Sequence, residues 1–215
     1  GKYDIMNDIM SLGLHRLWKE EFVKIIKPKS TDKVLDLAAG SGDITKILKK
    51  QSDCHCILFD ASLEMIKQAK KKLRNHDLTF ICGKCEKLPF KNNFFDYIIV
   101  SFGLRNFSDL KNSLVQIRRV LKKGGAFLCL EFSEINNPFF RKLFFFYCKL
   151  IPIYGELISG NKGAYQYLIQ SIKHFPNQIS LTKRLVDLGF NNIEVIDILD
   201  GLASIHIAKK CNIKK

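Results

Sequence analysis

The stretch VLDLAAGSGDIT, residues 34–45, combines the end of a buried strand, a loop of small residues and the start of a helix. Its apolar run ends in Asp36, the small residues 38–42 (AAGSG) follow, and Asp43 stands where a helix should begin. In an open α/β sheet, ligands bind beside the first turn from strand to helix. The stretch therefore predicts a loop that holds a nucleotide or a nucleoside.

Strands and helices are predicted to alternate on both sides of this stretch, which indicates a parallel, doubly wound sheet. Two further strands are joined by Asp200-Gly201, a hairpin signal. We therefore expect a single α/β domain over residues 1–215, Rossmann-like, with a seven-stranded, mostly parallel sheet, helices on both faces and an antiparallel C-terminal hairpin strand. An N-terminal helical segment (1–30) and a helical cap insert (136–176) complete it. The predicted strands are 33–38, 54–60, 78–83, 95–102, 126–132, 192–199 and 203–210, and the predicted helices are 3–27, 43–50, 63–73, 109–125 and 180–190.

The composition indicates a folded protein with a basic surface. The net charge is +14, carried mostly by lysines along the whole chain. This charge fits either compositional drift in an AT-rich genome or an anionic partner. The seven cysteines show no metal-binding spacing, so we expect no metal, a reducing compartment and no disulfides. The apolar stretch 139–158 is interrupted by charges, Pro152 and Gly155, so it should not cross a bilayer. The chain begins abruptly at GKYD, so targeting signals are expected outside it.

The loop does not fit a dinucleotide. Thr45 stands where a third glycine is expected, and the carboxylate of Asp43 at the helix start would repel a phosphate by roughly 1 kcal/mol or more. A cationic nucleoside would instead be attracted to Asp36, and Asp60 ends the second strand where an acid accepts hydrogen bonds from ribose hydroxyls. The predicted cofactor is therefore S-adenosylmethionine. The alternative is that Asp36 and Asp43 are an ordinary strand end and helix cap.

Several motifs resemble those of known methyltransferases. VLDLAAGSGDIT, LFDASLEMI, LPFKNNFFDYI and LKKGGAFLCLEF are similar to the class I S-adenosylmethionine-dependent enzymes. Residues 3–19, 101–109, 165–176 and 188–190 are narrower and resemble the ubiquinone/menaquinone biosynthesis C-methyltransferases of the UbiE type. The resemblance runs in order over nearly the whole chain.

The resemblance implies a set of residues that bind the donor. Ser41 would contact it within the loop, Asp60 would hold its ribose, Lys84 and Cys85 would lie against the adenine, and Ser101 would face the methionine end. The chain departs from the family at Ala39, where glycine is usual, and at Lys84-Cys85, where Asn-Ala is usual. The expected donor-binding residues are Asp36, Gly40, Ser41, Gly42, Asp60, Lys84, Cys85 and Ser101.

The implied reaction is methyl transfer to a ring carbon of a polyprenyl benzoquinol or a demethylmenaquinol. A ring hydroxyl must lose its proton, which requires an acceptor or a cation that stabilises the phenolate. We expect Arg105 to stabilise the phenolate and Asn106 to form a hydrogen bond with the ring oxygen. Water is expected to accept the proton, and the hydroxyl of Tyr3 is expected to complete the pocket. Arg105 has a structural alternative, a salt bridge with Asp109 or Asp4.

Three histidines are weaker candidates for a role in the site. His15 is a candidate proton acceptor that is more often structural in such a position, His174 could line the acceptor pocket, and His206 is expected to be structural. The aromatic cap could pack on the sheet, form a channel for a polyprenyl tail or rest on a membrane, with Lys142 and Lys149 near anionic head groups.

The expected partners are the polyprenyl quinol, a peripheral membrane contact and a quinone-biosynthesis complex or homodimer, with no nucleic acid. The expected location is the matrix side of the mitochondrial inner membrane if the protein is eukaryotic, and the cytoplasm or the membrane periphery if it is bacterial. Two rival functions stay open. One is methylation of RNA or another small molecule, and the other is a non-catalytic donor-binding subunit.

Overall fold

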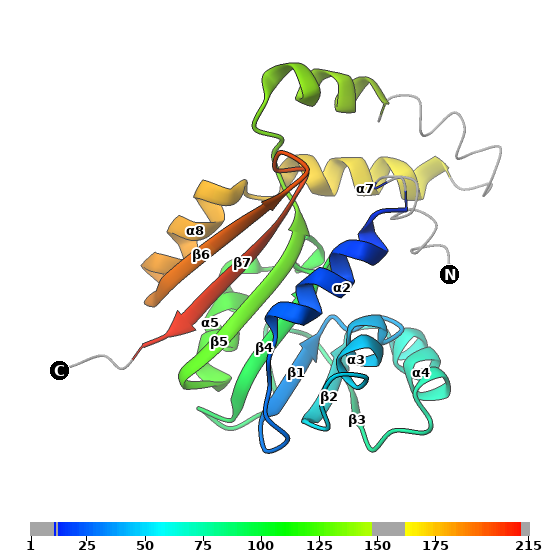
Figure 1. Ribbon diagram of the computed structural model, residues 1–215, viewed down its shortest axis with the longest axis vertical. Helices are drawn as coiled ribbons and strands as arrows, with labels where there is room; N and C mark the ends of the chain where they lie inside the picture. Colours follow the sequence, from blue (N-terminus) through cyan, green and yellow to red (C-terminus); the bar gives the residue numbers. More distant parts are fainter. Residues whose placement is uncertain (1–10, 12, 148–161, 212–215) are drawn as a thin grey trace.

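The computed structural model describes residues 11, 13–147 and 162–211, and all of its labelled strands form one sheet (Figure 1). The strand order is β3-β2-β1-β4-β5-β7-β6, and β7 runs antiparallel to both of its neighbours. This is the predicted seven-stranded, mostly parallel sheet with an antiparallel hairpin strand. The strands are β1 Lys33–Leu37, β2 His55–Asp60, β3 Thr79–Cys82, β4 Phe95–Ser101, β5 Leu121–Phe132, β6 Phe190–Ile198 and β7 Ala203–Lys210.

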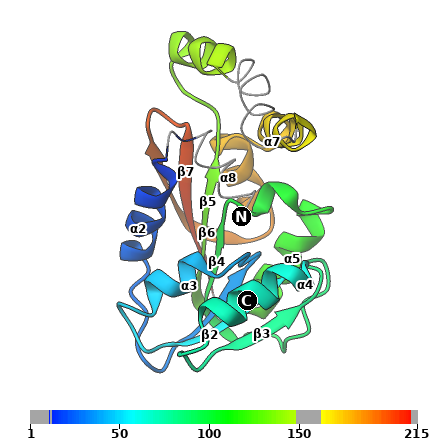
Figure 2. The same cartoon turned by 90° about the vertical axis from the view of Figure 1, so that its right-hand side faces the viewer.

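Helices cover both faces of the sheet (Figure 2). On one face α2 and α3 pack on the strands through Trp18, Phe22 and Leu48, and on the other α5 and α8 pack through Leu114 and Leu181. A further helix spans 138–147, and with α7 it lies beyond the carboxyl end of β5 (Figure 1). The labelled helices are α2 His15–Ile25, α3 Asp43–Leu48, α4 Leu63–Lys72, α5 Leu110–Val120, α7 Lys162–His174 and α8 Gln178–Asp187, with a 3-10 turn, η1, at Leu104–Asn106.

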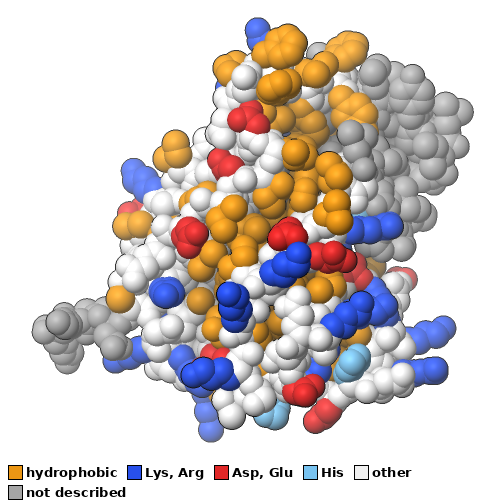
Figure 3. Space-filling view, viewed as in Figure 1, with side chains coloured by type: hydrophobic (Ala, Val, Ile, Leu, Met, Phe, Trp, Pro, Cys, Tyr) orange, Lys and Arg blue, Asp and Glu red, His pale blue; other side chains and the backbone are white. Residues whose placement is uncertain are grey.

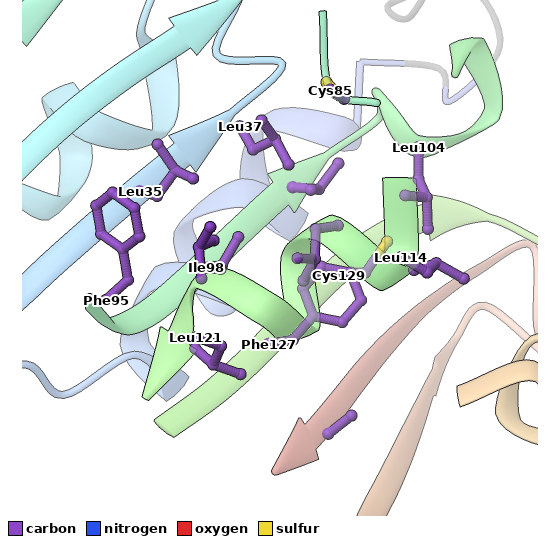
Figure 4. Close-up of a cluster of buried hydrophobic side chains, with 14 of the residues drawn as sticks. Leu35, Leu37, Cys85, Phe95, Ile98, Leu104, Leu114, Leu121, Phe127 and Cys129 are labelled. Atoms are coloured by element: carbon purple, nitrogen blue, oxygen red, sulfur yellow. The ribbon is translucent and has the colours of Figure 1, made fainter. Parts of the chain in front are cut away.

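The core between the sheet and α5 consists of aliphatic and aromatic side chains from the central strands (Figure 4). Leu35, Ile98 and Phe127 come from three adjacent strands and are each 0% exposed. Strands that are covered on both faces read as continuous apolar runs. This is why the segments ending in Asp36 and Ser101 were identifiable as buried strands. Their polar residues mark the carboxyl ends of these strands.

Several predicted helices differ from expectation. The N-terminal one was predicted to run unbroken over 3–27, but within the described residues it is interrupted at Gly13, which has a φ of +80°, and α2 spans His15–Ile25. The helices predicted over 43–50 and 180–190 end at Leu48 and Asp187. The helix over 109–125 was predicted to end at the glycines 124–125, but α5 ends at Val120 and β5 begins at Leu121. The ammonium of Lys210 donates hydrogen bonds to the carbonyl oxygens of Arg118 (2.6 Å) and Leu121 (2.7 Å), which satisfies this helix end.

The C-terminal hairpin and the cap region agree with the predicted pattern. Ile198 pairs with Ala203, and the loop between them contains Asp200 and Gly201, both with positive φ. In the region predicted as a cap insert, 138–147 and α7 are helical, and residues 148–161 lie outside the described part. Among the described residues, no helix is both long and apolar enough to cross a membrane.

Candidate functional site

A cavity of about 460 Å³ opens at the carboxyl ends of β1, β2, β3 and β4, where the topology of the sheet predicts a ligand. We call its wall from β1, β2, β3 and the last residue of β4 the donor edge (residues 36–43, 60–62, 84–86 and 101), and its wall after β4 the acceptor edge (residues 102–108). The described residues Gly42 and Arg105 do not line the cavity, and Tyr3 lies outside the described part of the chain. The predicted site residues that line it are Asp36, Gly40, Ser41, Asp60, Lys84, Cys85, Ser101 and Asn106.

The first loop turns by means of backbone conformations that favour glycine. Gly42 has a φ of +80°, and a Cβ added to it would stand 2.7 Å from the Cδ1 atom of Leu73. Gly40 also has a positive φ, of +55°, but faces open space and lines the cavity. Gly42 therefore shapes the loop as the N-cap of α3, which begins at Asp43, and it does not line the cavity.

Asp36 is buried at the end of β1 and is held by α3. Its Oδ2 atom accepts hydrogen bonds from the hydroxyl (2.6 Å) and the backbone amide (3.2 Å) of Thr45. Burial raises the pKa of Asp36 to about 7, although the two hydrogen bonds from Thr45 oppose the shift. The residue that departs from the dinucleotide pattern, Thr45, thus anchors the acid that lines the cavity.

Asp60 fixes the donor edge at the end of β2. Its Oδ2 atom accepts a hydrogen bond from the amide of Gly40 (2.9 Å), and its Oδ1 atom accepts one from the amide of Ser62 (2.8 Å). A carboxylate has about four lone-pair sites, so both oxygens retain capacity for a ligand's hydroxyls. The side chain is thereby fixed where it lines the cavity, with capacity for a ligand's hydroxyl groups.

The remaining donor residues line the cavity after β3 and β4. Burial raises the pKa of Cys85 to about 12, so its thiol stays protonated and acts as a small apolar surface. The Oγ atom of Ser101 is buried and has no hydrogen-bond partner within the described part of the chain. A polar atom without a partner that lines a cavity is expected to meet a ligand. These residues therefore offer a small apolar surface and a hydroxyl group to a ligand.

Two lysines pair with Asp43 at the start of α3, which corrects the repulsion expected from the sequence. Lys19 Nζ lies 2.9 Å from Asp43 Oδ2, and Lys72 forms a second ion pair with Asp43 Oδ1. Although burial opposes it, these two lysines hold the pKa of Asp43 below its usual range. Because two lysines pair with Asp43, its negative charge is compensated. Asp43 therefore does not repel an anion as the sequence suggested.

The acceptor edge begins with a strained turn. Phe102 has a φ of +52°, unusual for an aromatic residue, and its amide donates to the carbonyl oxygen of Leu130 (2.8 Å). A Cβ added to Gly103 would stand 2.6 Å from the Cβ of Ala38, so glycine is needed for the two edges to approach this closely. Such strain is held by the surrounding structure and concentrates at functional sites.

Asn106 is the predicted acceptor residue that the structure places in the cavity lining. Its Oδ1 atom accepts a hydrogen bond from the hydroxyl of Tyr167 in α7 (3.3 Å). Because Tyr167 occupies the amide oxygen, the amide nitrogen of Asn106 is the group left to donate to a ligand. The cap is thus joined to the acceptor edge by a side-chain contact.

Arg105 lies elsewhere than expected. Its side chain is 0% exposed, and Nη1 contacts Glu131 Oε1 (2.5 Å) and the carbonyl oxygen of Phe102 (2.7 Å). The backbone amide of Arg105 also donates to Glu131 Oε2 (3.2 Å). The structure thus contains the salt bridge that was the alternative, with Glu131 rather than Asp109 or Asp4 as partner. Its geometry does not support direct contact with a phenolate, because Glu131 compensates the charge beneath the turn.

The histidines do not line the cavity. His15 is buried, with Nδ1 3.2 Å from Ser11 Oγ, and its ring meets Phe102 edge-on. His174 Nδ1 contacts the carbonyl oxygen of Gln170, and His206 is buried in β7. Tyr3 lies outside the described residues.

Sequence reasoning missed three functional candidates, namely Lys19, Glu131 and Tyr167. Lys19 and Tyr167 lie within the motifs 3–19 and 165–176, and Glu131 lies in LKKGGAFLCLEF, so the motifs contained a signal. What the residues contact was not readable, because each partner lies on a distant segment.

The sheet order, the terminal hairpin and the acid-lined cavity define a class I S-adenosylmethionine-dependent methyltransferase. Solved structures at low identity support this fold. A SAM-dependent methyltransferase from Aquifex aeolicus matches with a TM-score of 0.66 and 16% identity, over 95% of this chain and 98% of its own. The carbon methyltransferase CurJ matches with a TM-score of 0.64 and 18% identity, over 90% of this chain and 54% of its own.

The chain belongs to the ubiE/COQ5 methyltransferase family, whose model matches residues 1–210. It is similar to the ubiquinone/menaquinone biosynthesis C-methyltransferase UbiE of Rickettsia felis, with 43% identity over 97% of this chain and 88% of the relative. The protein of the same name from Rickettsia akari is 42% identical over the same shares. The chain is therefore an enzyme that transfers a methyl group from S-adenosylmethionine.

Proposed function

We propose that this enzyme methylates a ring carbon of a polyprenyl benzoquinol or a demethylmenaquinol, a step of ubiquinone or menaquinone synthesis. The observation that carries the proposal is the 43% identity to UbiE over nearly the full chain. The cavity adds support, because it joins a donor edge to an acceptor edge that carries an amide and aromatic side chains.

The donor edge would hold the adenosine and methionine parts in the order of the strands. Lys84 and Cys85, after β3, would contact the adenine, and Asp60, after β2, would accept hydrogen bonds from the ribose. Ser41 and Ser101 would contact the methionine part near β1 and β4. The donor supplies a methyl group on a positively charged sulfur. Holding that group in line with a ring carbon contributes several kcal/mol to the rate.

The acceptor edge would bind and polarise the quinol. The amide nitrogen of Asn106 would donate a hydrogen bond to a ring oxygen, which stabilises negative charge there as the hydroxyl proton leaves to water. The proton of the methylated ring carbon would also leave to water, which restores the aromatic ring. Tyr167 would hold that amide in orientation. Arg105 would act as a positioning residue, because through Glu131 it fixes the turn that carries Asn106.

The test uses the purified chain with labelled S-adenosylmethionine and a short-tailed demethylated benzoquinol or naphthoquinol. Mass analysis should show one added methyl on a ring carbon. A methyl on oxygen, or no transfer to either quinol while donor binding is normal, would contradict the proposed acceptor. Transfer to tRNA with strong salt dependence would favour the rival function.

We further propose that helix 138–147 rests on a membrane that holds the polyprenyl substrate. Its side chains Phe139, Phe140, Leu143 and Phe146 are 70%, 53%, 55% and 61% exposed. Figure 3 shows hydrophobic side chains gathered at this end of the molecule. Phe144 packs inward on the core instead. Exposed Lys142 beside this apolar face and the net charge of +14 are complementary to anionic lipids.

Flotation with vesicles of neutral and of 30% anionic lipid would test this surface. Leu143→Asp and Phe146→Asp should abolish binding to anionic vesicles. Ile179→Asp, at a side chain that is 81% exposed in α8, should leave it unchanged. If the variants float like the original chain, or if sedimentation shows that they instead break a dimer, the membrane proposal fails.

The bacterial relatives fit a cytoplasmic protein that binds the membrane periphery.

A further inference from the structure

A cluster of three charges stands at the start of α3, at the mouth of the donor edge. Lys19 comes from α2, Asp43 from α3 and Lys72 from α4. The side chain of Lys19 is 11% exposed, against 31% for Asp43 and 33% for Lys72. The two ammonium groups face one carboxylate, so within this cluster one positive charge is not compensated, and Lys19 is the more buried of the two lysines. A buried excess charge is expected to meet a counter-ion.

Lys19 lines the cavity, and its position along the sheet edge is fixed by its neighbours. Trp18, the preceding residue, lies 6.4 Å from Phe102 between ring centroids, and Phe102 follows Ser101 at the end of β4. Lys19 therefore lies between the β1 loop and the end of β4. Lys84, another lysine of the lining, follows β3 at the other end of the strand order.

This position relates Lys19 to one part of the donor. With Asp60 at β2 between them, Lys84 lies on the side of β3 and Lys19 on the side of β1 and β4. A donor whose ribose lies at Asp60 has its adenine on one side and its methionine part on the other. The methionine part carries a carboxylate, which needs a cation or amide partner in a half-buried site.

We propose that Lys19 binds the carboxylate of the donor's methionine part. Asp43 and Lys72 hold the ammonium in place, and the carboxylate completes an alternating set of two cations and two anions. This inference depends on the donor and not on the identity of the quinol, so the two proposals can fail separately.

The test compares S-adenosylmethionine with its decarboxylated analogue, which lacks only the carboxylate, by isothermal titration calorimetry. The original chain should bind the complete donor at least about tenfold more tightly. Lys19→Met should remove this preference by weakening only the complete donor. Asp43 keeps Lys72 as a partner in this variant, so we expect it to fold.

The matched control is Lys84→Met, the same change at the other side of the ribose site. It should change the affinities for the two ligands by the same factor. If Lys19→Met weakens both ligands equally, Lys19 only ties α2 to α3 and the proposal is overturned. If the original chain itself does not prefer the complete donor, the proposal is overturned without any variant. Lys19→Arg, which keeps the charge, should retain the preference.

Discussion

The donor edge and the acceptor edge border one cavity but are held by different forces. At the donor edge, backbone turns and hydrogen bonds from nearby loop and helix residues orient Asp36 and Asp60, while Asp43 pairs with Lys19 and Lys72 from other helices. Thr45 lies only 9 residues from Asp36, and Gly40 lies 20 residues from Asp60. At the acceptor edge, Arg105 pairs with Glu131, and Asn106 meets Tyr167 61 residues away. A local motif can encode the first arrangement, whereas the second exists only after the chain has folded.

The strongest test of this difference removes the anion beneath the acceptor edge. Glu131→Gln leaves the guanidinium of Arg105 buried without a counter-ion, which should lower the free energy of unfolding by about 3–5 kcal/mol. Urea denaturation measures this. Donor affinity, measured under conditions where the variant is folded, should change little, while the KM for the quinol should rise.

An exposed pair provides the control. Lys24→Met removes the solvent-exposed ion pair with Glu21 and should cost less than about 1 kcal/mol. The double variant Arg105→Met/Glu131→Leu should recover most of the stability, because no charge is left unpaired. It should not recover the KM for the quinol if the pair positions the turn. Full recovery of the KM would contradict the positioning role.

The point where the two edges touch is sensitive to a single methyl group. Gly103→Ala would place its Cβ 2.6 Å from the Cβ of Ala38, which should cost about 1–3 kcal/mol and weaken donor binding. Because Ala38 itself has a φ of +56°, Ala38→Gly should be tolerated. The double variant Ala38→Gly/Gly103→Ala should restore stability and donor affinity. Additive losses by thermal unfolding and calorimetry would show that this contact is not the cause.

The fold was predictable because its signals are local. Apolar runs that end in Asp36, Asp60 and Ser101 identified the strands and the edge at which a ligand binds. The helix over 109–125 was misjudged, because its end depends on Lys210, whose ammonium satisfies the carbonyl oxygens there. A sequence pattern does not reveal a side chain that arrives from the last strand.

For the site, too, the positions of residues could be predicted from the sequence, but their side-chain partners could not. Eight of the predicted residues line the cavity because they follow strand ends, where topology alone places them. Arg105 also follows a strand end, but Glu131 draws its guanidinium under the sheet edge. The charge of Asp43 was likewise misjudged, since Lys19 and Lys72 reach it from other helices. Position was predictable from the sequence, whereas side-chain partners were not.

Titration of Asp36 would test the electrostatics of the donor edge. Its pKa of about 7 means that it is largely protonated below pH 7 without donor. A cationic donor favours the ionised form, so affinity should rise with pH and approach a plateau above 8, with about a tenfold gain from pH 6 to 8. Calorimetry in buffers of different ionisation heats should show proton release on binding near pH 7.

Asp36→Asn is the control for this titration. The variant can still accept the hydrogen bonds of Thr45, so its donor affinity should be lower and vary much less across this pH range. The unliganded original chain should also lose stability from pH 4 to 7 relative to the variant. The reason is that a carboxyl with a raised folded pKa stabilises the fold only while protonated. Equal pH profiles for the two proteins would contradict the assignment to Asp36.

The smallest expected effect concerns the bond that joins the cap to the acceptor edge. Tyr167→Phe removes the hydroxyl that donates to Asn106 Oδ1, a partly exposed hydrogen bond worth about 0.5–1 kcal/mol. The KM for the quinol should rise about twofold to fivefold, with the affinity for S-adenosylmethionine unchanged. In the Asn106→Ala background the same change should have no further effect, since the bond is already lost. A loss of donor affinity, or an undiminished effect in that background, would show that Tyr167 acts through another contact, and the coupling of the cap to Asn106 would have to be abandoned.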